Sequence, residues 1–284
     1  GGTQSLKPAS GAKMALWHGL LLMLIRAVCS STAENLQRLA QRPERRNRPL
    51  NVLGVSLGVL SAPLDAVAFA VAPQSVLAPV GMVGMLFSLL AANQVHGDDL
   101  TPKDFLSALA VVLGAALCLH GGADSSAARS APSSEMYATY VATAVIWCSL
   151  LAVALFACRE TAGRLDALAS ALLGGSLGSS SVVASKTFTA ALVSSPRSPL
   201  TLFCAALPLA LVAPLHLYVL NRSYGRHSLV IMSPSMGASA LLFNVLTGYL
   251  LFGEVPVGFW EFSLGISLIL SGVLSLMSWK SKRS

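Results

Sequence analysis

Three ionisable residues, Arg26, Asp65 and Lys186, interrupt long apolar runs of this chain. A charge at the centre of a bilayer costs on the order of 3 kcal/mol, so such a side chain usually faces the interior of a helix bundle and has a partner there. Asp65 and Lys186 lie at similar distances from the outer ends of their predicted helices, so we expect both to face one cavity. Two interpretations stay open: a permanent ion pair that joins two helices, or a pair that releases Asp65 to a cation in another state.

Neutral oxygen donors accompany these charges. The donors expected around the cavity are Ser30, Ser31, Thr32, Asn35, Gln74, Ser75, Asn93, Ser179, Ser180, Ser181 and Ser185. Mg²⁺ prefers hard oxygen ligands, keeps several of its waters and needs only one or two carboxylates. We therefore predict a substrate site with Asp65 as the metal ligand; its other members are Lys186, Gln74, Ser75, Asn93 and Ser181. The alternative is that the serine clusters serve helix packing.

The remaining polar residues of the apolar runs are given structural roles. Arg26 is interpreted as a residue that extends to the interface or bonds a carbonyl oxygen, and Glu34 as an interfacial residue. The five cysteines have no metal-site spacing and are interpreted as small apolar residues. No nucleotide-binding, hydrolase or metalloprotease motif is present, so we expect no enzyme and no cofactor.

The composition is that of a multi-pass membrane protein. Of the 284 residues, 54% are hydrophobic and 11% are charged, with a mean hydropathy of +0.69. A soluble domain has roughly 25% charged residues. The net charge of +7 lies mostly in short loops between apolar runs, so it indicates orientation rather than nucleic-acid binding. The expected partners are a cation substrate and membrane lipid.

Apolar runs near the span length of roughly 20 residues predict an all-α fold with about nine transmembrane helices. Their predicted ranges are 14–37, 50–71, 75–95, 103–121, 137–158, 166–192, 199–220, 227–252 and 257–279. The first could also be taken for a signal peptide, but Arg26 and His18 interrupt its apolar region, which favours a membrane helix.

The stretch from Pro63 to Asn93 is the centre of this prediction. It is apolar, yet it contains Asp65 and three prolines. We interpret it as two helices joined by a short turn at 72–74, with the second helix weakened at Pro79, because proline lacks a backbone N–H. Broken backbone at membrane depth is tolerated where it faces protein or a polar cavity, so this hairpin is predicted to line a substrate path.

The two halves of the chain resemble one another. SVLAPVG at 75–81 resembles SLVIMSPSMG at 228–237, and Asp98 corresponds to Glu254. These matches predict a four-helix unit used twice, at 14–121 and 166–279, around a linking helix at 137–158. The copies are displaced by five helices and therefore insert in opposite senses, as in many secondary transporters. The predicted hinges are Pro79, Gly81, Pro234 and Gly237.

The basic residues predict the orientation. With the N-terminus outside, 13 Lys and Arg residues fall on the cytoplasmic side and 4 on the other, as the positive-inside rule requires. The sequon that begins at Asn221 is then expected in a cytoplasmic loop, where it cannot be glycosylated.

Several stretches carry a resemblance to a known family. They are AENLQRLAQR at 33–42, AFAVAPQSVLAPVG at 68–81, LFSLLAANQ at 86–94, GGSLGSSSVVASKTF at 174–188 and YVLNRSYGRHSLVIMSP at 218–234. From about Leu16 to its end the chain resembles the NIPA-type magnesium transporters of the drug/metabolite transporter superfamily. The resemblance implies nine helices that move Mg²⁺ at the plasma membrane or endosomes. It identifies Lys186 with the lysine of the sixth-helix motif, and Pro79 and Gly81 with those of the central hairpin.

Three function classes follow. The first is a divalent-cation carrier that works by alternating access around Asp65. The second is a carrier of nucleotide sugars or other organic anions, in which Lys186 and Arg26 bind the anion. The third is a membrane scaffold without transport. The two transport hypotheses differ in the sign of the essential charge.

Overall fold

The computed structural model describes residues 9–40, 47–96, 101–122, 132–157, 164–193, 199–227 and 229–280. In these ranges the chain forms ten α-helices and no β-strand, which confirms the predicted all-α class. The helices are α1 (Ala9–Ala40), α2 (Arg48–Val71), α3 (Gln74–Gly81), α4 (Gly84–His96), α5 (Pro102–His120), α6 (Ser134–Ala157), α7 (Arg164–Val193), α8 (Pro199–Arg226), α9 (Leu229–Phe252) and α10 (Phe259–Lys280).

Eight segments in the described part of the chain are long and apolar enough to cross a membrane, which fits a multi-pass membrane protein. One of them, Gln74–Val95, combines α3 and α4, so the predicted span at 75–95 is one crossing made of two helices. The predicted ninth span at 257–279 corresponds to α10, whose described apolar part, Phe259–Ser275, is shorter than the other eight.

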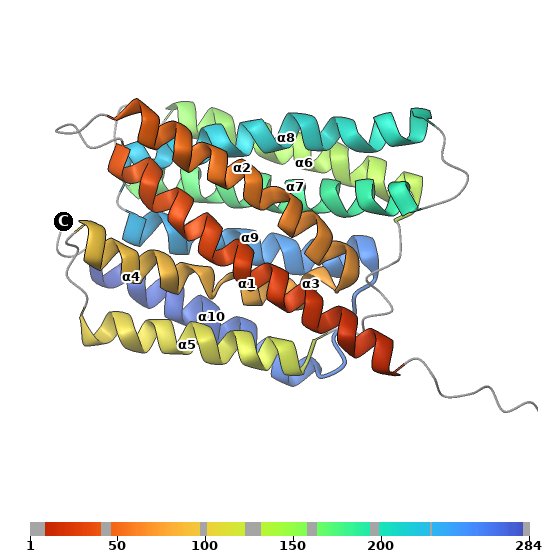
Figure 1. Ribbon diagram of the computed structural model, residues 1–284, viewed down its shortest axis with the longest axis horizontal. Helices are drawn as coiled ribbons and strands as arrows, with labels where there is room; N and C mark the ends of the chain where they lie inside the picture. Colours follow the sequence, from red (N-terminus) through yellow and green to blue (C-terminus); the bar gives the residue numbers. More distant parts are fainter. Residues whose placement is uncertain are drawn as a thin grey trace, which may run out of the picture.

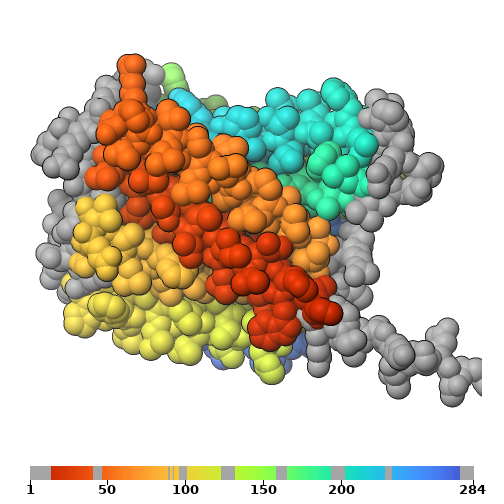
Figure 2. All heavy atoms as spheres, viewed as in Figure 1, coloured from red at the N-terminus to blue at the C-terminus, as the bar shows by residue number. Residues whose placement is uncertain are grey.

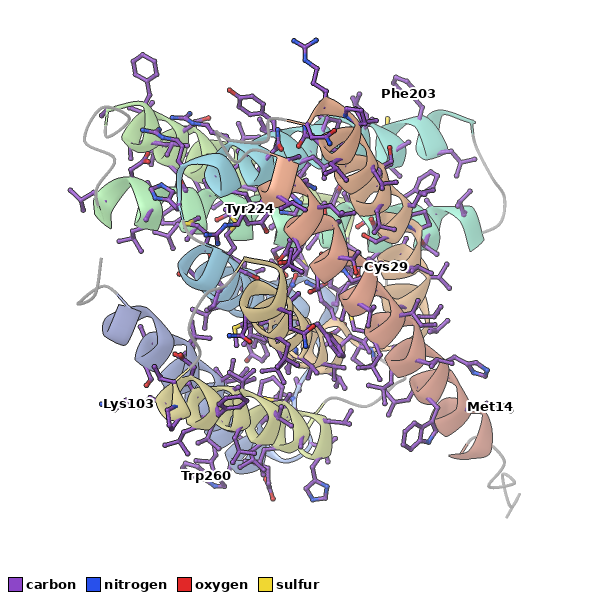
Figure 3. The ribbon with its side chains drawn as sticks, turned by 60° about the vertical axis from the view of Figure 1, so that its left-hand side comes forward. Met14, Cys29, Lys103, Phe203, Tyr224 and Trp260 are labelled. Atoms are coloured by element: carbon purple, nitrogen blue, oxygen red, sulfur yellow. The ribbon has the colours of Figure 1, made fainter. Side chains whose placement is uncertain are left out.

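Large apolar side chains cover the outside of the bundle. Trp260 is 80% exposed, Trp17 70% and Phe203 61%, and Figure 3 shows Trp260 and Phe203 at the periphery. Such a surface is unfavourable in water, but lipid tails accommodate it. The outward apolar face is therefore the second feature, besides helix length, that fits a membrane environment.

The helix pairs are arranged in layers (Figure 1). α1 packs along α2, and Figure 2 shows the two helices side by side on one face. α5 pairs with α10 on one side of the molecule, and α7 packs against α8 and α9 on the other, with α6 against α7. α3 and α4 lie between these groups, and α9 contacts α3, α4 and α10 as well as α7.

Close helix contacts depend on glycines at two helix pairs. A Cβ atom on Gly114 of α5 would lie 2.5 Å from the carbonyl oxygen of Gly265 in α10, and one on Gly54 of α2 would lie 2.9 Å from Gln37 Cγ in α1. Without a hydrophobic drive between helices in lipid, such close approach supplies much of the packing energy. The α1–α2 pair and the α5–α10 pair are held in this way.

The ends of α2 and α5 follow from their sequences. Asn47 Oδ1 accepts the backbone N–H of Leu50 at 3.3 Å and caps α2. Thr101 and Asp104 form a reciprocal capping box at the start of α5. The sequon at Asn221 lies inside α8, so the expectation of a loop at this position is wrong.

The central hairpin has the predicted turn and a sharper break than predicted. α2 ends at Val71, Ala72 is extended, and α3 starts after Pro73. Pro79 is the sixth residue of α3 and has no backbone N–H to donate, and the helix is interrupted at 82–83 before α4 begins. Met82 N–H and Met85 N–H bond carbonyls three residues back, at 3.1 and 3.0 Å, which tightens the chain locally. The membrane crossing is therefore divided into two helices.

Candidate functional site

A cavity of about 350 Å³ lies inside the bundle, with walls from α1, α2, α3, α4, α7, α8 and α9. We call it the central cavity. The ionisable side chains that line it are Arg26, Glu34, Asp65, His216 and Tyr224. All five belong to segments long enough to cross a membrane. Figure 3 shows Tyr224 inside the bundle, where it is 4% exposed.

One carboxylate of the central cavity is neutralised. Arg26 Nε donates to Asp65 Oδ2 at 2.9 Å and joins α1 to α2. The two side chains are 30% and 17% exposed, so the pair faces the cavity rather than dry core. Asp65 Oδ1 is buried and has no hydrogen-bond partner within the described residues. The pair therefore keeps one acceptor for a further ligand.

The second carboxylate, Glu34, is bonded only by neutral groups. Ser88 Oγ of α4 donates to Glu34 Oε2 at 2.9 Å, and Ser233 Oγ of α9 donates to the same atom at 3.0 Å. Ser88 Oγ also lies 3.1 Å from Ser31 Oγ, one turn before Glu34 on α1. The Tyr224 hydroxyl of α8 also bonds this carboxylate, so Glu34 joins α1, α4, α8 and α9 through hydroxyl groups.

A separate set of charges joins the start of α3, α7 and the segment after α9. Glu254 accepts the backbone N–H groups of Gln74 at 3.0 Å and Ser75 at 2.7 Å, and it forms an ion pair with Lys186. Lys186 Nζ also lies 4.0 Å from the ring centroid of Phe252. We call these five residues the Glu254 cluster. None of them lines the central cavity.

Local backbone geometry places Glu254 there. Gly253 has φ +62°, the left-handed region that glycine adopts without a Cβ clash. The chain turns back at this residue, and Glu254 N–H donates to the carbonyl oxygen of Gly248 at 3.0 Å. The carboxylate then meets the first N–H groups of α3, where the helix dipole favours an anion. The Glu254 side chain is fully buried as a result.

Gln74 adds a second connection between α3 and α9. Its Nε2 donates to Asn244 Oδ1 at 2.9 Å and to Thr247 Oγ1 at 2.9 Å. Gln74 is fully buried and Ser75 is 1% exposed. The start of α3 is therefore fixed to the end of α9 by both backbone and side-chain bonds.

The structure does not bring Asp65 and Lys186 together. Each has another partner, Arg26 for Asp65 and Glu254 for Lys186, so the predicted pair between them is wrong. The reason is that Gly253 returns a loop acid into the bundle, which a count of charges inside predicted helices does not include. Asp65 faces the central cavity as expected, whereas Lys186 does not.

The other predicted site residues divide in the same way. Ser181 lines the central cavity and donates to the carbonyl oxygen of Gly178 at 3.0 Å in its own helix. Gln74 and Ser75 belong to the Glu254 cluster, and Asn93 is exposed on α4 outside the cavity lining.

The predicted hinge residues belong to α3 and α9, two helices that pack on each other. Pro79 and Pro234 are buried inside α3 and α9, while Gly81 and Gly237 line the cavity. A Cβ atom on Gly237 would lie 2.9 Å from Met82 Sδ, at the break between α3 and α4. The two corresponding segments of the halves therefore pack against one another; their role as hinges stays a prediction.

Sequence reasoning missed Glu34 and Glu254 as interior acids. Glu34 was interpreted as interfacial because it lies near a helix end, although Ser31, Glu34 and Gln37 recur every three residues, a polar face that indicates an interior position. Glu254 was noted only as the counterpart of Asp98, which lies outside the described residues.

The described residues contain no group of three or more His, Cys, Asp or Glu that could hold a metal ion. The chain matches no family model, no curated protein and no solved structure.

Proposed function

We propose that this protein is a carrier of divalent cations, Mg²⁺ foremost, that works by alternating access. The observation that carries the proposal is the charge of the central cavity. Among the described residues that line it, Arg26 is the one permanently charged cation, against the two carboxylates Glu34 and Asp65. With both acids ionised and His216 neutral, the cavity has a net charge of minus one, which attracts a cation in a medium of low dielectric constant.

The predicted inverted repeat supports a carrier. Helix pairs of the first half have counterparts in the second: α1 packs on α2 as α7 packs on α8, and α1 packs on α3 and α4 as α7 packs on α9. α5 and α10, the last helices of the two predicted units, pack on each other. In transporters built from two inverted units, the substrate site lies between the units and one unit rocks against the other, so these pairings support the proposal.

The Glu254 cluster supports a state that is closed on one side. It joins α3, α7 and α9 beyond the end of the central cavity, with a charge pair that is 3% and 0% exposed. In the proposed orientation, with the N-terminus outside and the C-terminus cytoplasmic, this end is extracytoplasmic. The cavity would then exchange its ion with the cytoplasm in this state.

The resemblance to NIPA-type transporters gives the proposal its substrate and its location. It favours Mg²⁺ and a plasma-membrane or endosomal site. The organic-anion alternative loses support from the geometry, because Lys186 lies in the Glu254 cluster and Arg26 is neutralised by Asp65.

Uptake by the purified full-length protein tests the proposal. Proteoliposomes with an internal Mg²⁺ indicator are compared with protein-free liposomes, and the same vesicles are offered radiolabelled UDP-sugars. We expect saturable Mg²⁺ uptake and no sugar-nucleotide uptake. Uptake of UDP-sugars alone would establish the anion carrier, and no flux of either would favour a scaffold.

A further inference from the structure

The two acids of the central cavity differ in what compensates their charge. Asp65 has a guanidinium at 2.9 Å, whereas the hydrogen bonds to Glu34 come from the neutral hydroxyls of Ser88, Ser233 and Tyr224. No lysine, arginine or histidine of the described chain forms an ion pair with Glu34. Arg26 attracts Glu34 only from beyond ion-pair distance, so a ligand cation would compensate this buried carboxylate more directly.

A second polar residue of the same helix face, Gln37, has one buried oxygen without a hydrogen-bond partner among the described residues. Gln37 is 3% exposed and lines the central cavity, and its Oε1 atom has no hydrogen-bond partner among the described residues. Its aliphatic part is fixed against α2, because Gly54 leaves just enough space for Gln37 Cγ. A buried amide oxygen without a donor is uncommon in proteins and indicates an absent ligand or water.

Glu34 and Gln37 lie three residues apart on α1 and therefore on the same face of the helix. Ser31 precedes Glu34 by the same interval, and Ser88 and Ser233 approach from α4 and α9. One carboxylate, one amide oxygen and several hydroxyls thus converge from three helices. α4 begins directly after the break at 82–83, so a movement at this break would move Ser88 relative to α1.

We infer that Glu34 and Gln37 form the binding site for a partly hydrated divalent cation, with the Ser31, Ser88 and Ser233 hydroxyls around it. This inference rests on the proposed function and names the ligands of its site. Hard oxygens, a single negative charge and space for retained waters match the requirements of Mg²⁺, which gives up its hydration shell reluctantly. Asp65 then serves mainly to neutralise Arg26.

The test uses the full-length protein in lipid nanodiscs and in proteoliposomes. Thermal unfolding is measured with and without MgCl₂, and Mg²⁺ uptake is measured in parallel, for the wild type, Glu34→Gln and Gln37→Leu. For Glu34→Gln we expect no Mg²⁺-dependent rise in unfolding temperature and an Mg²⁺ uptake rate at least tenfold lower than that of the wild type. Gln37→Leu should lower the apparent Mg²⁺ affinity several-fold. Glu135→Gln, the same change at an exposed position of α6, should behave as wild type.

The stability of Glu34→Gln without Mg²⁺ separates ion binding from a purely structural role of Glu34. If Glu34 binds the ion, Glu34→Gln in Mg²⁺-free buffer should unfold at the same or a higher temperature than wild type, because it removes a buried charge that has no ion-pair partner and keeps an acceptor for both serines. A lower unfolding temperature in Mg²⁺-free buffer would overturn the inference.

Mg²⁺ uptake by the wild type distinguishes a wrong ligand assignment from a wrong proposed function. If the wild type takes up Mg²⁺ and Glu34→Gln does so equally well, the ligand assignment is wrong and the carrier remains. If the wild type shows neither Mg²⁺-dependent stabilisation nor uptake of Mg²⁺, Mn²⁺ or Co²⁺, both fail.

Discussion

The Glu254 cluster and the central cavity each contain a pair of a basic and an acidic residue, but the surroundings of the two pairs differ. In the cluster, Lys186 and Glu254 are buried, and the carboxylate has two backbone donors besides the ammonium group. In the cavity, Arg26 and Asp65 are partly exposed, and one carboxylate oxygen has no partner within the described part of the chain. The comparison teaches that a charge inside membrane helices points to a substrate only where its surroundings leave space and unsatisfied acceptors.

The largest effect is expected from breaking the cluster. Glu254→Ala leaves the Lys186 ammonium buried and the first N–H groups of α3 without an acceptor. Removing one partner of a buried ion pair costs about 3–5 kcal/mol, so the unfolding temperature in detergent should fall strongly. Glu135→Ala, at an exposed site, is the matched control. If Glu254→Ala lowers the unfolding temperature no more than Asp65→Asn does, the ion pair of the cluster is no more important for stability than that of the cavity.

A smaller effect on stability, but a clear one on uptake, is expected in the cavity. Asp65→Asn leaves Arg26 as an uncompensated cation beside the path of the ion. A unit charge within several ångströms changes binding by an energy sufficient for about tenfold or more in affinity. The apparent affinity for Mg²⁺ in the liposome assay should fall by this factor.

The double variant Arg26→Gln/Asp65→Asn sharpens this prediction. It restores neutrality at the pair, so we expect Mg²⁺ uptake to recover most of the loss caused by Asp65→Asn. A double variant as inactive as the single one would instead identify Asp65 as a direct ligand of the ion. The comparison of the two variants thus separates charge compensation from coordination.

The smallest effect is expected at Ser181. It lines the central cavity, but its hydroxyl bonds the carbonyl oxygen of Gly178 in its own helix, and such a bond contributes little beyond the helix itself. Ser181→Ala should change both Mg²⁺ uptake and unfolding temperature only marginally. A loss comparable with that of Asp65→Asn would make Ser181 a ligand.

The helices themselves were largely predictable. Each predicted span corresponds to an observed helix or, at 75–95, to a pair of helices, because apolar length is a local property of the sequence. The turn before Gln74 was predictable for the same reason, since proline restricts its own residue and the one before it. The interior position of Asp65 followed from the cost of its charge in lipid.

The partners of the charges were not predictable from spacing alone. Lys186 and Glu254 are 68 residues apart, and Arg26 and Asp65 are 39 apart. Which acid meets which base depends on the rotation of each helix and on single turns such as Gly253. Glu34 was assigned to the interface because depth was estimated from distance to a helix end, whereas the face of the helix decided its surroundings.

The sequence by itself determined that apolar helices form a membrane bundle around a few costly charges, because hydropathy and proline act over one helix at a time. Only the tertiary structure decided that Arg26 neutralises Asp65, that Lys186 is held by a residue from a loop, and that Glu34 faces the cavity with no ion-pair partner among the described residues. The physical reason is that electrostatic energy depends on distances between side chains of different helices, and packing fixes these distances.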